Sequence, residues 1–157
     1  MIEYFRITDF MLPMIILQNE QIAAVIYEDG AKLDIPDVVN QFWIGAKTEE
    51  NVIGCFQFNQ VSAIVWEIHI RILPQFRKDY AIKASKGALN WAFCNIPNLH
   101  KIIGYVPDVY KHAVAHCEAI GMKQEAYLAE SFLLKGEIIG QHYFSITARE
   151  FGGTQCQ

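Results

Sequence analysis

The chain has 157 residues, of which 52% are hydrophobic and 19% charged, and this composition is typical of one compact domain with a real core. Its formal net charge of -4 argues against general nucleic-acid binding, since it gives no field that follows a phosphate backbone. The apolar run from Phe10 to Leu17 is far shorter than the roughly 20 residues that span a bilayer, so we expect no membrane partner.

The first half of the chain predicts a strand, capped helical segments, a turn and an irregular or briefly helical stretch, in this order: Glu3 to Ile7, Thr8 to Ile26, Glu28 to Gly30, and Leu33 to Asn40. Three runs rich in β-branched and aromatic residues follow: Phe42 to Lys47, Val52 to Asn59, and Ala63 to Ile72. The breaks between these runs are short and polar, which favours an antiparallel meander.

The second half alternates between helices and strands. We expect a helix, a strand, a helix and two strands, in this order: Tyr80 to Cys94, Lys101 to Val106, Val109 to Ile120, Met122 to Phe132, and Gly140 to Ala148. Asp108 can cap the second helix, and Gly121 is the expected left-handed stop. The order predicts an α+β fold in which helices cover both faces of a mixed sheet. We expect a single domain over residues 1–157, with 151–157 as a flexible tail.

The four cysteines are scattered without a CxxC pair, at positions Cys55, Cys94, Cys117 and Cys156. This spacing favours neither a zinc site nor a disulfide framework. We therefore expect a reduced protein in the cytoplasm. His112 and His116 stand four residues apart on one predicted helix, but no cluster completes a metal site, so we expect no metal.

The segment from Trp66 to Phe151 resembles the GNAT superfamily of acyl-CoA-dependent N-acyltransferases. WEIHIRILPQFRKDYAIKA is similar to the family's central strand, pyrophosphate turn and following helix, and YKHAVAHCEAIGM is similar to its next helix. More narrowly, these sequences resemble small GNAT-like proteins of tailed bacteriophages. The resemblance implies a GNAT fold with acetyl-CoA or CoA as the cofactor. It also implies a pantetheine-sized cleft between the strand ending at Ile72 and the strand from Lys101 to Val106.

The family's pyrophosphate turn, Q/R-x-x-G-x-G/A, uses a glycine so that backbone N–H groups can approach the phosphates. An alignment on Ala81 puts Asp79 at this glycine, whereas an alignment on Arg77 puts Tyr80 there. In the first alignment we expect Asp79 to cap the following helix and repel a diphosphate, which leaves CoA binding weakened or lost. Arg77 and Lys78 oppose this effect, or they form only a solvated turn.

An N-acyltransferase needs a base for the attacking amine and an acid for the departing thiolate. Glu67, His69 and Arg71 share one face of the central strand by its period of two. Glu67 is our first candidate for the base and His69 our second, since histidine titrates near neutrality. The alternative is a strand whose polar side faces solvent or a partner.

The resemblance assigns the remaining positions. Backbone groups of Ile72 and Leu73 correspond to those that pair with the pantetheine arm, and Tyr110 stands where the family has asparagine. Cys117 takes the place of the family's frequent acid, a tyrosine. A helical cysteine is usually a small buried apolar residue, so no catalytic acid is evident.

Two classes of function remain open. The chain is an acyl-CoA-dependent N-acyltransferase acting on a protein or small amine, or a degenerate descendant of one. Alternatively, it is a non-catalytic phage virion or head-assembly protein that uses the fold as an interaction surface. In the second class, we expect the protein to form a homo-oligomer or to bind an assembly partner. We then expect it in the host cytoplasm or in the virion.

Overall fold

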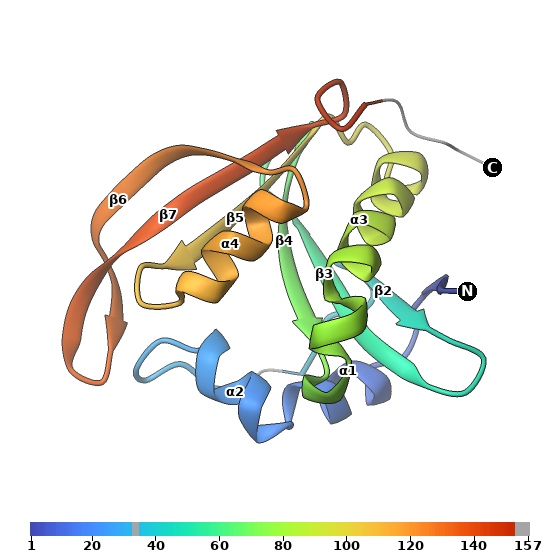
Figure 1. Ribbon diagram of the computed structural model, residues 1–157, viewed down its shortest axis with the longest axis horizontal. Coiled ribbons are helices and arrows are strands. Elements are labelled where there is room, and N and C mark those ends of the chain that lie inside the picture. The colour runs from blue at the N-terminus through green and yellow to red at the C-terminus, as the bar shows by residue number, and fades with distance from the viewer. Residues whose placement is uncertain (33–34, 153–157) are drawn as a thin grey trace.

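The computed structural model describes residues 1–32 and 35–152, in which seven strands form one mixed sheet (Figure 1). The elements in chain order are β1 (Glu3–Arg6), α1 (Met11–Leu17), α2 (Glu20–Ile26), β2 (Phe42–Lys47), β3 (Val52–Gln60), β4 (Val65–Ile72), a 3-10 turn (Pro74–Phe76), α3 (Arg77–Asn95), β5 (Lys101–Pro107), α4 (Lys111–Ala119), β6 (Lys123–Leu134) and β7 (Glu137–Thr147). The strand order is β1-β2-β3-β4-β5-β7-β6. Neighbouring strands are antiparallel except β4 and β5, which are parallel.

The predicted α+β fold is confirmed, including the meander, the helix–strand–helix unit and the C-terminal hairpin. The hairpin turns at Lys135 and Gly136, which both have positive φ, and it extends away from the rest of the sheet (Figure 1). Gly121 has φ 96° after α4, as expected for a left-handed stop. Within the described residues, no helix has both the length and the apolar character needed to cross a bilayer.

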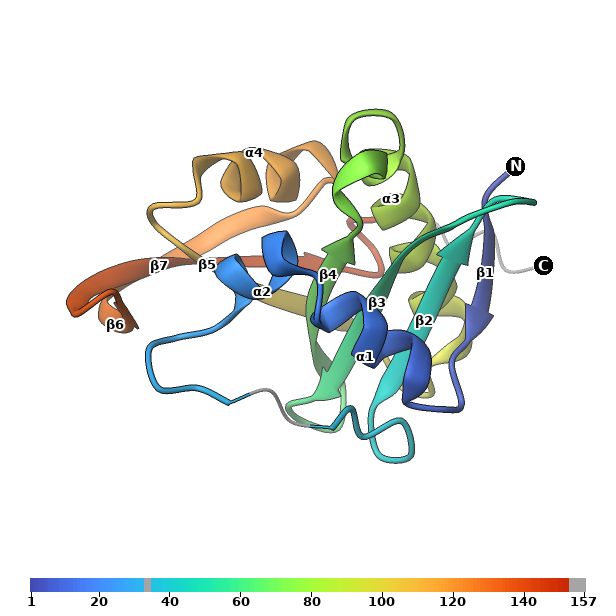
Figure 2. The same ribbon diagram turned by 90° about the horizontal axis from the view of Figure 1, so that it is seen from below.

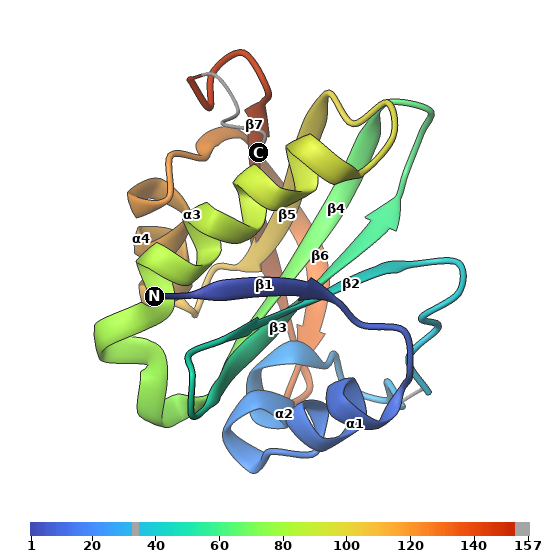
Figure 3. The ribbon, with the colours of Figure 1, turned by 90° about the vertical axis from the view of Figure 1, so that its right-hand side faces the viewer.

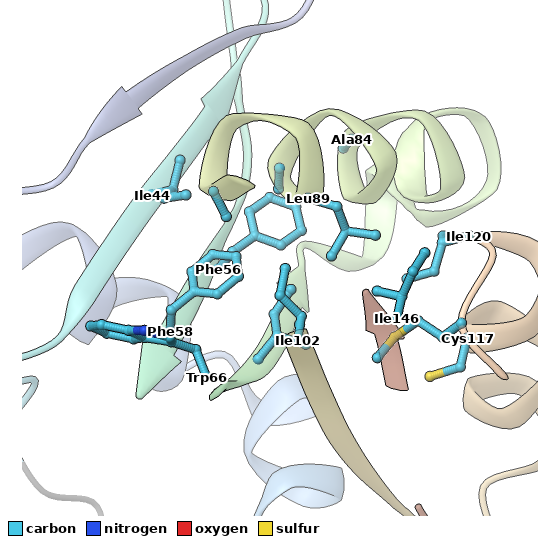
Figure 4. Packing of buried hydrophobic residues seen from close by; sticks show 14 of the residues in the cluster. Ile44, Phe56, Phe58, Trp66, Ala84, Leu89, Ile102, Cys117, Ile120 and Ile146 are labelled. Carbon is cyan, nitrogen blue, oxygen red and sulfur yellow. The ribbon is translucent and has the colours of Figure 1, made fainter. Parts of the chain in front are cut away.

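Helices cover both faces of the sheet, as predicted (Figures 2 and 3). Alternation along β2 and β3 explains why two separate cores form. Ile44 and Phe56 point to the face that carries α3 and α4, where they pack in the larger core with Leu89 (Figure 4). Trp43 and Cys55 point to the opposite face and pack with the apolar side chains of α1 and α2.

Small residues bring α3 close to the sheet. Ala84, Ala88 and Ala92 are fully buried on its inner face. The hydroxyl of Tyr4 on β1 donates a hydrogen bond to the carbonyl of Ala84 (3.0 Å), which ties the edge strand to the helix. This hydrogen bond anchors α3 to the β1 edge of the sheet.

The N-terminal helical stretch consists of two short helices. Asp9 accepts a hydrogen bond from the Met11 amide (2.9 Å), and Asn19 accepts one from the Gln21 amide (3.1 Å) at the start of α2. Gly30 has φ 81° in the predicted turn. Of the irregular stretch, Leu33 and Asp34 lie outside the described residues, and residues 35–40 contain a turn but no helix.

Two predicted helix caps are wrong. α3 begins at Arg77, after Phe76 as the N-cap, so Asp79 lies in the first helical turn instead of capping it. The reason is Pro74, which starts a 3-10 turn. The Pro74 carbonyl accepts a hydrogen bond from the Arg77 amide, so the turn leads directly into the helix. α4 follows Tyr110, while Asp108 accepts hydrogen bonds from Lys111 and His142.

The end of the chain differs in part from the expected tail. Phe151 was expected in a flexible segment, but its ring lies 5.6 Å from that of Phe93 on α3 and packs against the larger core. Its amide donates to the carbonyl of Thr147 (3.0 Å). Residues 153–157 lie outside the described part of the chain.

Candidate functional site

The two parallel strands of the sheet separate towards their carboxyl ends. β4 and β5 pair only from Val65 opposite Lys101 to Glu67 opposite Ile103. Beyond this point β4 stays with β3 as far as Ile72, whereas β5 stays with β7 along its whole length. A cavity of about 600 Å³ opens between them. The implied cleft is therefore present, at the place the sequence indicated.

Residues from both faces of the sheet line the cavity. On one side it is lined by Ile22, Val25 and Ile26 of α2, which lies beside the open ends of β4 and β5 (Figure 2). On the other side it is lined by residues of α4, among them Ala113 and Cys117.

The two candidate bases lie together in the wall of this cavity. Glu67 Oε1 is 3.3 Å from His69 Nε2, and both side chains are partly exposed to the cavity. Burial raises the pKa of the Glu67 carboxyl, and the positive charge of Arg71 opposes this shift. Burial lowers the pKa of His69 to about 4, with a further lowering by Arg71, so its imidazole is neutral at pH 7. His69 is thus the neutral member of the pair, and the raised pKa makes the Glu67 carboxylate more basic than an ordinary one.

Tyr105 is a cavity residue that the sequence prediction missed. It lies on β5 two residues after Ile103, and thus on the same face as Glu67 across the cleft. Burial raises the pKa of its phenol, as does the charge of Glu67, so the hydroxyl stays protonated. The alternation along the Lys101 to Val106 run could have shown which residues share a face with Tyr105. Placing that face beside Glu67 also required knowing that this strand pairs in parallel with β4.

On the α4 side, the cavity brings Tyr110 and Cys117 together, both assigned by the resemblance. Burial raises the pKa of the Cys117 thiol to about 11, which makes it a poor nucleophile and a poor acid. Burial also raises the pKa of the Tyr110 phenol. His116 contacts the buried Ser85 hydroxyl through its Nε2 (3.0 Å). Across residues 1–32 and 35–152, no group of three or more potential metal ligands comes together.

Only some of the residues assigned to the cofactor line the cavity. Ile72, Arg77 and Ala81 line the cavity. Arg77 Nε donates to the Ile72 carbonyl (3.1 Å), which holds its side chain across the end of the cleft. Leu73 is not in the lining, and its amide donates to the carbonyl of Ile53 (2.9 Å), so this amide is already part of the sheet.

The other three assigned residues lie outside the cavity lining. Lys78 and Asp79 are exposed on the first turn of α3. Tyr80 packs its ring edge-on against Phe76, with 6.0 Å between centroids, and contacts the larger core. Neither Asp79 nor Tyr80 has positive φ, so neither position requires a glycine for its backbone conformation.

Comparison with known proteins connects this geometry to a family. The family described as Protein of unknown function (DUF2824) matches residues 10–154. A relative from Acyrthosiphon pisum secondary endosymbiont phage 1, described as Putative protein p31, is 24% identical over 111 residues, which are 71% of each chain. The phage relation that the sequence indicated is thereby supported.

Solved structures share the fold at low sequence identity. Spermidine N-acetyltransferase from Vibrio cholerae in complex with CoA and spermine is 20% identical with a TM-score of 0.79, covering 96% of this chain and 97% of that chain. The same enzyme in complex with manganese ions has a TM-score of 0.74 at 20% identity, covering 96% and 94%. The fold is thus that of the GNAT N-acetyltransferases, as predicted.

Proposed function

We propose that this chain, which belongs to the DUF2824 family, is an acyl-CoA-dependent N-acyltransferase that acts on an amine. The observation that carries the proposal is the parting of β4 and β5 into a cavity of about 600 Å³. This volume is in the range of pockets that bury a small-molecule ligand. The cavity reaches from Arg77 at the start of α3 to Glu67, so a cofactor bound at one end would meet a base at the other.

The residues at the start of α3 fit an anionic cofactor. The positive end of the helix dipole lies there, and Arg77 and Lys78 add two cations. Because Asp79 makes no capping hydrogen bond, its carboxylate leaves the first-turn amides free of a side-chain acceptor. Its charge still offsets part of the attraction. We therefore expect CoA to bind, with an affinity below that of a glycine turn.

The chemistry needs a proton acceptor on the α2 side. Acetyl-CoA supplies an activated acyl carbonyl and a thiolate leaving group, and the amine nitrogen forms the new bond to that carbonyl. Glu67 takes the proton that the amine loses, directly or through water, because burial has made its carboxylate more basic. The neutral imidazole of His69 is 3.3 Å away and can hold the carboxylate in place through its N–H.

The proton for the leaving thiolate comes from a different group. Tyr110 lines the α4 side of the cavity and stays protonated at neutral pH. Cys117 occupies the position of the family's usual acid, yet its raised pKa makes it unsuited to this step. We assign the role to Tyr110 or to solvent that enters beside it.

Calorimetry tests cofactor binding and an acetyl-transfer assay tests the chemistry. We expect purified protein to bind CoA and acetyl-CoA with measurable heat, and to acetylate at least one member of a panel of primary amines. Glu67→Gln should retain CoA binding and lose transfer, since the amide cannot accept the proton. No heat and no thermal shift at millimolar CoA would remove the proposal.

A non-catalytic role in a phage particle or its assembly is the second candidate. It is favoured by the replaced glycine of the pyrophosphate turn, by the missing tyrosine at Cys117 and by the phage relative. In this role the fold would present an interaction surface in the host cytoplasm or in the virion. Acetyl transfer that disappears in Glu67→Gln would count decisively against it, and co-purification with a virion protein would favour it.

A further inference from the structure

Arg71 is a buried cation in the wall of the cavity, and the described residues offer it no carboxylate partner. Its side chain is only 8% exposed. No acidic oxygen in residues 1–32 or 35–152 lies within 4.0 Å of it, and its Nε has no hydrogen-bond partner there. Nη1 reaches only the His69 carbonyl, at 3.5 Å. A buried guanidinium is usually paired, because its desolvation is costly.

The neighbours of Arg71 do not neutralise it. Its guanidinium lies over the ring of Trp43, 5.4 Å from the centroid. Cys55 stands opposite it in the sheet, and burial raises the pKa of that thiol to about 12, so it carries no charge. Glu67 is the carboxylate that attracts Arg71 electrostatically, but it forms no ion pair with the guanidinium. Arg71 is therefore a buried cation without a directly bonded anion, and its guanidinium keeps hydrogen-bonding capacity to spare.

Arg71 also stands in line with the candidate base. Glu67, His69 and Arg71 occupy alternate positions on β4, and all three line the cavity. Arg71 lies four residue steps along the strand from Glu67, which is about 13 Å between Cα atoms. The guanidinium turns back towards the His69 carbonyl, which shortens the distance to the base. A molecule whose amine lies at Glu67 would thus extend along β4 towards Arg71.

We propose, on the basis of the proposed function, that Arg71 binds a carboxylate of the acceptor, so that the substrate class is an amine that also carries an acidic group. A planar guanidinium matches a carboxylate in shape and charge, and such charge-assisted hydrogen bonds are among the strongest in proteins. A polyamine such as the spermine bound to the Vibrio cholerae enzyme offers no group for Arg71 and adds like charge beside it. The acceptor is either a small amino acid or the N-terminus of a peptide with an acidic side chain.

Matched acceptors that differ only in charge test the inference. The first pair is 6-aminohexanoate and its amide, the second is a short peptide with aspartate or asparagine at its second position, and spermidine is the polyamine reference. We expect one acid to exceed its amide in kcat/KM by about tenfold to a hundredfold, the range for a hydrogen bond to a charged group. The pair that shows the preference identifies whether the acceptor is a free amino acid or a peptide.

Variants separate recognition from packing. Arg71→Met should reduce the acid-to-amide ratio to near one, while Arg71→Lys should keep part of it. Arg6→Met is the matched control, because Arg6 also stacks on an aromatic ring, 3.9 Å from the centroid of Phe42, and lies outside the cavity lining. It should lower the melting temperature and leave the ratio unchanged.

Direct binding keeps the inference independent of turnover. Calorimetry of the CoA-free protein with 6-aminohexanoate, its amide and the two peptides needs no acyl transfer. An acid that binds wild-type protein more tightly than its amide, with the difference lost in Arg71→Met, supports the inference even where no amine is acetylated. Equal binding of every acid and its amide, or spermidine as the best acceptor, would overturn it and leave the proposed function standing.

Discussion

Replacing Gly104 tests whether the cleft between β4 and β5 is the place of the cofactor. Gly104 lies on β5, one residue beyond the last position that pairs with β4, and it lines the cavity. A Cβ atom at this position would lie 3.8 Å from Ile68 Cγ2 and 3.9 Å from Met122 Cε, which is ordinary contact. Its φ is not positive, so alanine and valine can adopt the backbone conformation. The fold should therefore accept an alanine, and the two further methyl groups of valine should make the cleft narrower.

The expected stability change is small and favourable. Gly104→Ala should stabilise the protein by about 0.4–1 kcal/mol, because alanine restricts the unfolded chain without strain in the folded one. For a chain of this length, this corresponds to a rise in melting temperature of roughly 1–4 °C. Differential scanning calorimetry measures it. A fall in melting temperature would show that the space beside Gly104 is not available.

The expected change in binding is large and unfavourable. The two methyl groups of valine project from Cβ into the cleft, where the pantetheine arm would lie. We expect Gly104→Val to weaken CoA binding by more than about tenfold, which is 1.4 kcal/mol, with an unchanged circular dichroism spectrum. If the Gly104→Val protein bound CoA as tightly as the wild type does, the assignment of the cleft to the cofactor would be refuted.

Gly54→Ala is the control that separates the two effects. Its Cβ would overlap the backbone carbonyl oxygen of Arg71 and lie 2.9 Å from Ile72 Cα on β4. Backbone atoms cannot move aside as the end of a side chain can, so this alanine should destabilise the sheet. It should lower the melting temperature, in contrast to Gly104→Ala.

The other predictions concern charge and proton transfer. Glu67→Gln should lower kcat/KM by about 10²–10⁴, and it should remove the acid limb of the wild-type pH profile, which lies above 4.5 because burial raises the Glu67 pKa; an unchanged profile would exclude Glu67 as the base. The free energy of unfolding should fall as pH decreases from 6.5 towards 4, because His69 takes up a proton in the unfolded state and resists it in the folded state. In denaturation experiments on His69→Gln, the free energy of unfolding should depend less on pH in this window. Asp79→Asn should tighten CoA binding by no more than about fivefold, since exposed charges interact weakly; a larger gain by calorimetry would mean that the carboxylate lies at the phosphates. Cys117→Ser should leave kcat nearly unchanged, because the thiol neither ionises nor donates readily at neutral pH, and a large loss in the transfer assay would contradict this.

Local patterns in the sequence were sufficient for the elements and for the polar face of β4. Period-two alternation placed Glu67, His69 and Arg71 on one face, and all three line the cavity. Topology decided the rest. Tyr105 reaches the same cavity only because β5 runs parallel to β4 and then diverges from it. Arg71 shares the cavity wall with residues of α2, which lies far away in sequence.

The error at Asp79 has a similar origin. An aspartate before an alanine-lined helix is a good cap by composition, but capping requires the residue that precedes the first helical position. Pro74 starts the 3-10 turn early, and α3 has already begun at Arg77, two residues before Asp79. The tendency of Asp79 to cap a helix was thus overridden by Pro74, which lies five positions upstream and sets the start of the helix.

The early start of α3 also changes what the missing glycine means. In both alignments the replaced position, Asp79 or Tyr80, lies in the first turn of a regular helix without positive φ. The replacement therefore costs no backbone strain, and only the space above the helix start is in question. Tyr80 turns its ring towards Phe76 and the core, and Asp79 is exposed without a capping bond. Neither side chain is fixed across the amides of the first turn, so an anionic cofactor can still reach the positive end of the helix.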